Sequence, residues 1–390
     1  MTVLPLQSLS PAAVEDALIR RGVDQGHAAA SARGMRSVTV VIDDLSTEQR
    51  DLVLAEARRH GVECLTGERW ALLTGGAAAL AGLVHPDRTR MPLALAERLA
   101  ALVAATFDPP EAWVMGRGRI SLDRPVIAGI LNVTPDSFSD GGRFLDPDAA
   151  LRHAESLIAM GADLLDVGAE STRPGSVGPV PVEEEWHRLA PVLRALEARF
   201  PEVPLSVDTV KAETARRALD SGAWAINDVS GLRLDPTVAD VCAAHDAGLV
   251  LMHSRGAFDE MASYAHASYG HVVAEVVREL TGGAAVAEAA GLDRSRIVLD
   301  PGLGFAKTPE QNFEVLRDLP SVAGLGYPVM VGPSRKRFLG TIMGRETLDR
   351  DLATAAACVT AYLGGARLFR VHAVAPTLES LAVAYAVRSA

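Results

Sequence analysis

The last two-thirds of the chain alternates short apolar runs with longer amphipathic runs, and this alternation limits the possible folds most strongly. The amphipathic stretches, such as residues 148–160 and 182–199, are typical of helices. The apolar runs between them are short and uniformly hydrophobic, which indicates strands of a parallel sheet covered on both faces. The eight strand candidates are residues 126–133, 164–168, 204–208, 225–228, 249–252, 297–300, 328–332 and 368–371.

Eight strand and helix pairs in one stretch predict the α/β class and a (β/α)8 TIM barrel. An open, doubly wound sheet is the alternative, because the number of strands alone does not prove closure. Residues 1–115 predict a separate, small α/β N-terminal domain of unknown role, with a helix near 11–21, a strand at 37–42, a helix at 47–60 and a strand pair within 62–73. The prolines and other breakers of residues 107–118 indicate the junction with the barrel domain, residues 116–390.

Polar residues stand at or just after the C-terminal end of each strand candidate. In a barrel these ends meet on one rim, so residues far apart in sequence converge on one pocket. Any one of them could cap a helix, because loops between strands and helices need such residues. Their occurrence at all eight ends indicates a site. They are Asn132, Glu170 to Arg173, Asp208, Asn227 with Asp228, His253, Asp300, Ser334 to Lys336, and Arg370 with His372.

The rim residues indicate two kinds of ligand chemistry. Asp208, Asn227 and Asp300 are short acceptors and donors suited to the edge of a flat, nitrogen-rich heterocycle, since a carboxylate accepts two parallel N–H groups strongly in a dry site. The apolar residues expected to flank such a ring are Ile130, Val229 and Met252.

The cationic residues of the rim indicate an anion such as pyrophosphate. They are Arg335, Lys336, Arg370 and His372, in a chain whose formal net charge is −11. Asn132 is placed to help hold a magnesium ion on that anion. A heterocycle bearing pyrophosphate is an electrophile, so the rim predicts transfer of the heterocycle to a nucleophile.

The acidic charge of the chain argues against broad binding of nucleic acid or anionic membranes. The three cysteines, Cys64, Cys242 and Cys358, are far apart and odd in number, so neither a zinc site nor a disulfide framework is indicated. The N-terminus has no signal-peptide pattern, and no apolar run is long enough to span a membrane. We therefore expect a cytoplasmic protein that binds small molecules.

Eight motifs carry a resemblance to a known family. In order they are GILNVTPDSFSDGG, GAESTRPG, SVDT, INDVSG, LMH, DPGLGF, SRK and RVH. From about Arg119 to the C-terminus the chain resembles the dihydropteroate synthases of the pterin-binding family, with the N-terminal domain as an extra part. The resemblance implies that 6-hydroxymethyl-7,8-dihydropterin pyrophosphate condenses with 4-aminobenzoate to give 7,8-dihydropteroate and pyrophosphate, in a homodimer made through barrel helices.

The resemblance also implies roles for individual residues. Asp208, Asn227, Asp300 and Lys336 would hold the pterin, and Asn132, Arg370 and His372 would bind pyrophosphate and its Mg²⁺. Of these seven residues, all except Asn227 form the expected catalytic set. The aminobenzoate site would be shaped by Thr172, Arg173, Pro174, Phe305 and Ser334. The loops after Asn132 and Glu170 are expected to move and close over the substrates.

Two positions depart from the family pattern: Ala373 stands where Asp often follows RVH, and Ala306 stands where GFGK has its second Gly. One alternative function is an inactive pterin-binding paralogue, which Ala373 alone favours. The other is a corrinoid-linked methyltransferase using methyltetrahydrofolate, which the STRPG, SRK and RVH motifs argue against, because a methyl donor carries no pyrophosphate. Lys211 and Lys307 stand near strand ends, where either could be a further anion contact, but both are interpreted as surface lysines.

Overall fold

The computed structural model describes residues 15, 18–20, 22–28, 37–85, 89–107, 110–133, 147–170, 179–342 and 350–389. By its contacts the chain forms two compact units, and each is described here by itself. The first unit comprises Met1–Pro109 together with Gly324–Gly326 and Ala390, and the second runs from Pro110 to Ala323 and from Tyr327 to Ser389. The boundary expected near residue 115 stays a prediction.

The N-terminal unit is a small α/β domain built on a three-stranded antiparallel sheet of order β1-β3-β2. Helix α3 begins with a capping box, in which Ser46 and Gln49 satisfy each other's backbone N–H groups. Buried residues of β1, α3, β3, α4 and α5 pack into one apolar cluster, which confirms the predicted α/β character. The elements are β1 (Ser37–Ile42), α3 (Thr47–Arg59), β2 (Glu63–Thr66), β3 (Ala71–Gly76), α4 (Ala77–Leu83) and α5 (Leu93–Phe107). Most of the helix predicted near 11–21 lies outside the described residues.

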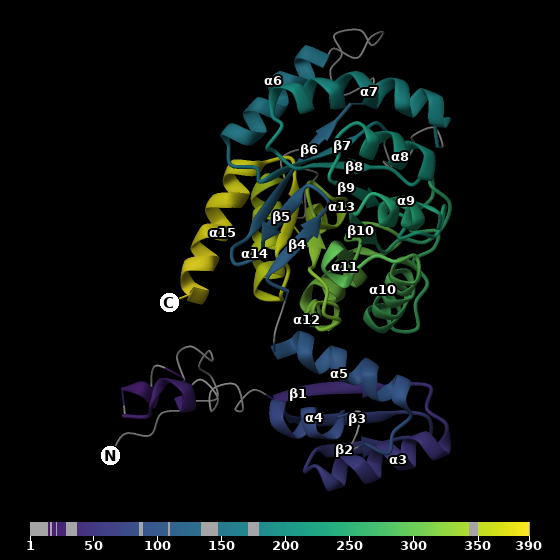
Figure 1. Ribbon diagram of the computed structural model, residues 1–390, viewed down its shortest axis with the longest axis vertical. Coiled ribbons are helices and arrows are strands. Elements are labelled where there is room, and N and C mark those ends of the chain that lie inside the picture. Colours follow the sequence, from purple (N-terminus) through teal and green to yellow (C-terminus); the bar gives the residue numbers. More distant parts are fainter. Residues whose placement is uncertain are drawn as a thin grey trace. The chain divides into compact units, whose positions relative to one another are not determined.

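The second unit is an eight-stranded parallel barrel surrounded by helices (Figure 1). Its strands run in the order β11-β10-β9-β8-β7-β6-β13-β12. A bridge between Leu299 and Val329, and a 2.9 Å bond from Leu299 N to Pro328 O, join the two ends of this sheet. The predicted TIM barrel is therefore confirmed over the open sheet. The strands are β6 (Val126–Asn132), β7 (Leu164–Gly168), β8 (Leu205–Asp208), β9 (Ala225–Asp228), β10 (Gly248–Met252), β11 (Ile297–Asp300), β12 (Met330–Val331) and β13 (Leu368–Val371).

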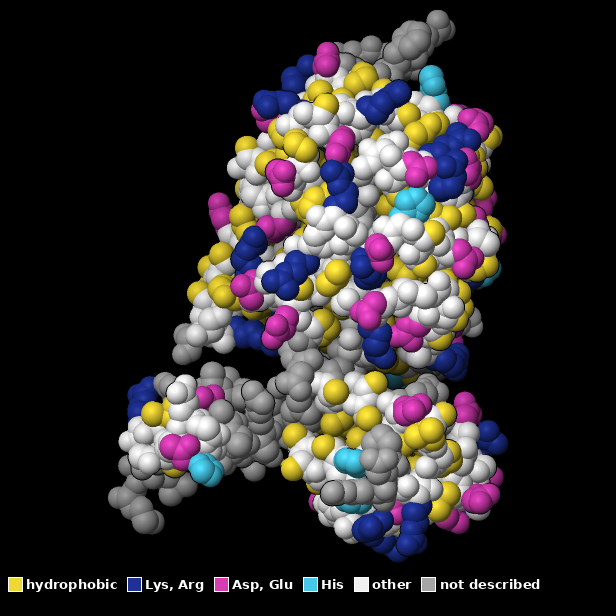
Figure 2. Space-filling view, in the orientation of Figure 1, with side chains coloured by type: hydrophobic (Ala, Val, Ile, Leu, Met, Phe, Trp, Pro, Cys, Tyr) yellow, Lys and Arg dark blue, Asp and Glu magenta, His cyan; other side chains and the backbone are white. Residues whose placement is uncertain are grey.

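The helices follow the strands in the expected alternation. They are α6 (Pro147–Ala159), α7 (Val182–Arg199), α8 (Ala212–Asp220), α9 (Val238–Ala244), α10 (Val272–Ala289), α11 (Pro309–Arg317), α12 (Pro320–Ala323), α13 (Arg337–Thr341), α14 (Asp351–Leu363) and α15 (Val374–Ser389). Among the described residues, no helix is both long and apolar enough to cross a membrane. On the visible face of this unit, acidic and basic side chains are interspersed rather than gathered by sign (Figure 2).

A two-stranded ribbon, β4 (Ala112–Met115) and β5 (Gly118–Ser121), packs against the interior at the N-terminal ends of the strands. Its Trp113 is fully buried and donates its indole N–H to Arg296 O at 2.9 Å. A Cβ on Gly248 would meet the Trp113 ring at 2.8 Å, so only glycine allows the ring to lie there. Strand β4 lies in the stretch interpreted as the junction, so the barrel unit includes that ribbon.

Candidate functional site at the barrel mouth

The barrel interior is layered, and the layers explain which side chains reach the mouth. The deeper layer is apolar and packs on Trp113; it consists of Val126, Ala128, Leu164, Ala225, Val250, Val298, Met330 and Leu368. Side chains alternate along a strand, so the residue two positions further along faces the interior again, nearer the C-terminal end. That rule predicts the next layer as Ile130, Asp166, Asn227, Met252, Asp300, Gly332 and Arg370. The outer layer therefore brings polar side chains to the mouth, and the layer beneath it is apolar.

Arg370 lies between two carboxylates at this mouth. Its Nε donates to Asp166 Oδ2 at 2.5 Å, and its second terminal nitrogen donates to Asp208 Oδ2 at 2.8 Å. Asn227 also donates to Asp166 Oδ2, at 3.2 Å. Residues from β7, β8, β9 and β13 thus meet, over a sequence separation of 204 positions between Asp166 and Arg370. Sequence reasoning missed Asp166 because it searched strand ends, and Asp166 lies in mid-strand.

Asn132 and Asp208 approach the same point beside Gly168. A Cβ built on Gly168 would have Asn132 Oδ1 and Asp208 Oδ2 both at 3.6 Å. The three residues come from the ends of neighbouring strands, with Asn132 paired to Gly168 and Gly168 paired to Asp208. The structure therefore places two oxygen atoms, one of them carboxylate, over a residue that has no side chain.

Asp300 is wholly enclosed at the end of β11. Its Oδ1 accepts from Gly302 N at 2.7 Å, which fixes the carboxylate at the start of the following turn. A Cβ built on Gly332 would lie 3.9 Å from Asp300 Oδ2 and 3.8 Å from Arg370 Cβ, so β11 and β13 face each other across the end of β12. Asp300 and Arg370 therefore belong to one mouth.

Burial is the largest influence on the pKa values of Asp208 and Asp300. It raises the pKa of Asp208, and Arg370 opposes that rise. Burial also raises the pKa of Asp300 to about 6, with the Gly302 N–H and the nearby lysines opposing. For Arg370, burial disfavours the charge, but Asp166 and Asp208 outweigh it, so the pKa of Arg370 is raised. A guanidinium paired with a carboxylate of raised pKa, here Asp208, is typical of functional clefts.

Two further pairs complete the mouth. Lys336 Nζ lies 3.5 Å from the centre of the Phe305 ring, a cation–π contact. Ser334 Oγ lies 2.9 Å from His372 Nδ1 and also accepts from His372 N at 3.1 Å. The His372 ring therefore has a fixed partner whatever residue follows it, so Ala373 does not leave the imidazole unsupported.

An apolar wall stands beside the polar mouth. Val229, Met252 and Phe305, which the sequence assigned to ligand contact, pack in one buried cluster. The same cluster contains four residues that sequence reasoning did not single out: Val210, Phe258, Met261 and Ala262. Three of these come from the loop between β10 and α10, so that long loop supplies part of the wall.

Some predicted residues are not at the mouth or lie outside the described part of the chain. Arg335 makes two bonds to Asp351, at 2.8 and 2.9 Å, so its guanidinium is engaged at the start of α14, and its phosphate role stays a prediction. Thr172, Arg173 and Pro174 lie outside the described residues, as do the stretches expected to move after Asn132 and Glu170.

The interpretation of Lys211 as a surface lysine was wrong. Its Nζ lies 2.8 Å from Glu170 Oε2 and 3.0 Å from Glu185 Oε2, and Glu185 is fully buried. Glu170 also accepts from Val180 N at 2.5 Å. An ammonium shared by two enclosed carboxylates explains why a lysine is placed here, because each charge offsets the cost of burying the other.

Ala306 adopts a conformation that glycine favours, with φ of +44° and a side chain 1% exposed. The left-handed region costs a residue with a side chain about 1–2 kcal/mol. Ala306→Gly removes that cost, but it also removes a buried methyl group and adds chain entropy, each about 0.8 kcal/mol. We expect the free energy of unfolding in urea to stay within about 0.5 kcal/mol of the parent.

The control for that experiment is Ala285→Gly, at an exposed position inside α10. It relieves no strain and is expected to lower the free energy of unfolding by about 1 kcal/mol. Equal losses at the two positions would contradict the assignment of strain to Ala306.

Comparisons with known proteins agree with this geometry. The family profile of the pterin binding enzymes matches residues 128–372. A dihydropteroate synthase from Mycobacterium leprae is 44% identical over 270 residues, covering 68% of this chain and 94% of that protein. One from Synechocystis is 41% identical over 265 residues, covering 68% of this chain and 90% of that protein.

Solved structures give the same result. The chain is similar to a Xanthomonas albilineans dihydropteroate synthase with 4-aminobenzoic acid, at a TM-score of 0.66 and 44% identity, covering 72% of this chain and 99% of that one. It is also similar to a Burkholderia cenocepacia dihydropteroate synthase complexed with 7,8-dihydropteroate, at a TM-score of 0.64 and 40% identity, covering 72% and 97%.

The barrel and its mouth define a pterin-binding enzyme. The two relatives, which this chain matches over 90% and 94% of their length, are both dihydropteroate synthases, so they narrow this class to one family. The chain belongs to the dihydropteroate synthase family, the transferases of folate biosynthesis, which confirms what the eight motifs implied.

Proposed function

We propose that this mouth condenses 6-hydroxymethyl-7,8-dihydropterin pyrophosphate with 4-aminobenzoate, giving 7,8-dihydropteroate and pyrophosphate. The observation that carries the proposal is the convergence of Asp208, Asp300 and Arg370 on one polar mouth. Solved relatives with 4-aminobenzoic acid and with 7,8-dihydropteroate support the second substrate and the product.

The pterin end of the substrate is assigned to the acids and amide of the interior. Asp208, Asn227 and Asp300 would accept from and donate to the ring edge, with Lys336 beside them. The apolar residues Ile130, Val229 and Met252 would flank the ring faces. Because Asp300 is buried and Asp208 is half-buried, their hydrogen bonds to a ring gain strength from the low local dielectric.

The leaving group is assigned to Arg370 and His372, and the second substrate to Phe305 and Ser334. An arylamine is a weak nucleophile, so departure of pyrophosphate is the demanding step. The exocyclic C–O bond breaks and its electron pair leaves with pyrophosphate; the amine nitrogen then forms the C–N bond and loses a proton. Arg370 and His372 would stabilise the departing charge, while Asp208 and Asp300 would tolerate positive charge on the ring.

We also propose Mg²⁺ as the metal that the pyrophosphate brings to the site. The described residues contain no group of three His, Cys, Asp or Glu side chains that could hold a metal. The Asn132 amide oxygen and Asp208 Oδ2 both lie 3.6 Å from a Cβ built on Gly168, and this amide oxygen fits an ion that takes its other ligands from phosphate and water. Such an ion would neutralise charge on the leaving pyrophosphate.

Calorimetry of pyrophosphate binding tests this metal assignment without relying on turnover. Binding is expected to weaken about tenfold or more when Mg²⁺ is removed with EDTA. In Asn132→Ala the same removal should have a smaller effect, because one ligand of the ion is already missing. Binding of equal strength with and without Mg²⁺ in the parent protein would contradict the assignment.

The reaction itself is tested by measuring pyrophosphate release with each substrate alone and with both. Release that requires both substrates supports the synthase. No release while the pterin still binds would identify a binding-only paralogue. Methyl transfer from methyltetrahydrofolate to a corrinoid, without pyrophosphate release, would identify the methyltransferase.

We propose that the protein is a homodimer formed through α14 and α15, which pack on each other (Figure 1). Leu352 and Leu363 of α14 are 82% and 60% exposed, and Val383 and Val387 of α15 are 66% and 73% exposed. Leu352 and Leu363 are about three helical turns apart and share a side of α14, as Val383 and Val387 do on α15. Such apolar exposure on adjacent helices is typical of an interface.

Sedimentation equilibrium checks this proposal. The parent protein should have twice the chain mass, and Leu352→Glu combined with Val383→Glu should have the chain mass, because buried unpaired carboxylates oppose association. Val286→Glu, at an exposed apolar position on α10, is the matched control and should remain dimeric. A monomeric parent, or an unchanged double variant, would refute the assignment.

A cytoplasmic location is also proposed. The three cysteines are free thiols, and Cys242 and Cys358 are buried, which fits a reducing compartment.

A further inference from the structure

Lys307 is the least expected buried side chain of the barrel unit. It was interpreted as a surface lysine, yet it is 0% exposed. Burying an ammonium is costly unless its three N–H groups all find acceptors. Lys307 Nζ lies 2.9 Å from His253 Nδ1, 3.1 Å from Gly302 O and 3.2 Å from Phe305 O. The number of acceptors matches the number of donors.

The first of these acceptors connects Lys307 to helix α10. Since His253 Nδ1 accepts from the ammonium, Nε2 carries the ring proton and donates to Glu279 Oε2 at 3.0 Å. Burial, with the Lys307 charge, lowers the pKa of His253 to about 4, in agreement with a neutral ring. Glu279 is in turn paired with Arg255. The ammonium is therefore one end of a continuous chain of hydrogen bonds and ion pairs that runs through His253 and Glu279 to Arg255.

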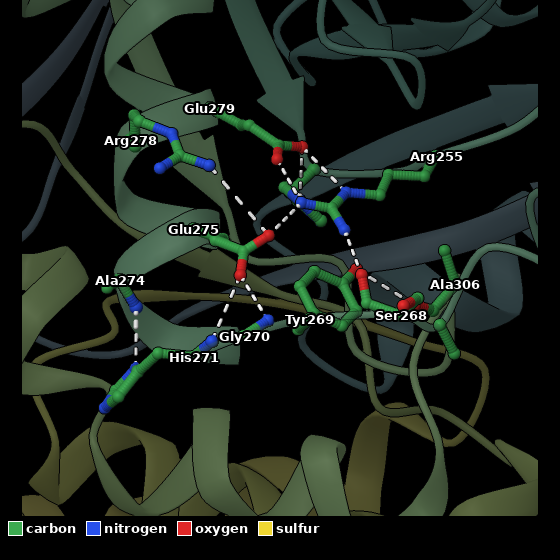
Figure 3. Close-up of polar contacts among 12 residues, drawn as sticks. Arg255, Ser268, Tyr269, Gly270, His271, Ala274, Glu275, Arg278, Glu279 and Ala306 are labelled. Carbon is green, nitrogen blue, oxygen red and sulfur yellow. Dashed lines mark hydrogen bonds and ion pairs between the residues drawn. The ribbon is translucent and has the colours of Figure 1, made fainter.

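That chain is anchored at its other end by several contacts. Arg255 also pairs with Glu275 at 2.7 Å and lies 4.0 Å over the Tyr269 ring. Figure 3 shows the Arg255 guanidinium between Glu275 and Glu279. Tyr269 donates to Ala306 O at 2.9 Å, so the same group of residues contacts the chain immediately before Lys307.

The other two acceptors lie in the turn of residues 302–305, which connects two substrate positions. At one end Gly302 N donates to Asp300 Oδ1. At the other end is Phe305, whose ring lies against Lys336. A Cβ on Gly304 would meet the Lys336 side chain at 2.6 Å, so the turn also sets where Lys336 lies. A movement of this turn would displace residues assigned to both substrates.

We propose that Lys307 is a positioning residue of this active site, whose ammonium holds the turn of residues 302–305 so that Asp300 and Phe305 face the two substrates. The inference rests on the proposed function, because those two residues have their roles there. Lys307 contacts neither substrate; it acts through the backbone carbonyls that it binds.

The ammonium also makes the turn sensitive to pH. Burial lowers the pKa of Lys307 to about 7. The negative charges of Asp300 and Glu279 oppose this fall, and the positive charges of Arg255 and Lys336 add to it. His253, which also faces the ammonium, is neutral. Loss of the proton leaves two N–H groups for three acceptors. Affinity for both substrates should therefore fall as pH rises above the pKa of Lys307, in addition to any effect of groups that contact substrate directly.

The test compares pH profiles of kcat and KM in the parent and in Lys307→Met, which has a similar length and no charge. KM for 4-aminobenzoate and for the dihydropterin pyrophosphate should each rise about tenfold or more, because a displaced turn misplaces both binding groups. The alkaline limb of the pH profile, in which both KM values rise above the pKa of Lys307, should disappear in this variant. A variant with parental KM values and an unchanged alkaline limb would overturn the inference.

Glu279→Gln keeps the test decisive if Lys307→Met does not fold. Glu279 raises the pKa of Lys307, so its neutralisation should move the alkaline limb to lower pH. Glu288→Gln, the same change further along α10, is the matched control and should leave the limb in place. Identical limbs in the two variants would refute the inference. A parent protein that releases no pyrophosphate would instead refute the proposed function.

Discussion

Arg370→Met is expected to lower kcat by about 10³-fold, because it removes the guanidinium that stabilises the departing pyrophosphate. The structure adds a second effect. Arg370 is the partner of both Asp166 and Asp208, so its loss leaves one buried and one half-buried carboxylate without a counter-charge. We expect the free energy of unfolding to fall by about 3 kcal/mol as well. Steady-state kinetics and urea denaturation measure the two effects separately.

A double variant shows whether the loss of turnover merely follows from the loss of stability. Adding Asp166→Asn removes one of the unpaired charges, so Arg370→Met with Asp166→Asn should recover part of the stability and none of the turnover. Arg367→Met, which removes a guanidinium just before the other end of β13, is the matched control and should retain kcat. Turnover that recovers together with stability would show that Arg370 has only a structural role.

Asp300→Asn is expected to lower kcat/KM for the dihydropterin pyrophosphate by about 10²-fold to 10⁴-fold. An amide can still accept from Gly302 N, so the turn keeps its bond, but the charge-assisted bonds to the pterin are lost. Two bonds to a charged group contribute roughly 1.5–3 kcal/mol each, from which we expect a loss of this size. Asp240→Asn on the exposed side of α9 is the control and should behave as the parent.

The same variant has a pH signature in the substrate-free protein. Asp300 has a folded-state pKa of about 6, above the ordinary 3.8, so the folded protein binds its proton more tightly than the unfolded chain does. Stability from this group is fully present below pH 3.8 and is lost as pH rises through 6. The difference in unfolding free energy between Asp300→Asn and the parent should therefore grow in favour of the variant from pH 4 to pH 7. A constant difference would show that burial does not govern this carboxyl.

The sequence predicts most of the barrel because its strands and helices have distinct periodicities. Seven strand predictions agree with the structure to within a residue at each end, whereas β12 is only two residues long. Its neighbours in space, β11 and β13, and the bridge at Val329 define its place, and no local pattern carries that information.

The site was predicted less completely, for a physical reason in each case. Asp166 was missed because it lies in the middle of an apolar run. Only the layering of the barrel shows that a residue at this position faces the mouth. Lys211 and Lys307 were assigned to the surface because lysine is usually exposed, and only the fold shows the acceptors that enclose them. Asp208 and Asp300 were found because they end strands, and Arg370 because it stands one residue before the end of β13, where position alone indicates function.

Most strands of the barrel contribute to both interior layers: one residue packs in the deeper layer, and the residue two positions further along faces the mouth. Positions two residues apart share the interior, so a strand can exchange its outer member for one that suits a different substrate while its deeper member still packs around Trp113. The side-chain period is two, so inserting one residue within a strand would turn its outer member away from the mouth and toward the helices. Evolution of new specificity on this scaffold should therefore proceed by substitution within strands and by changes of length only in the loops.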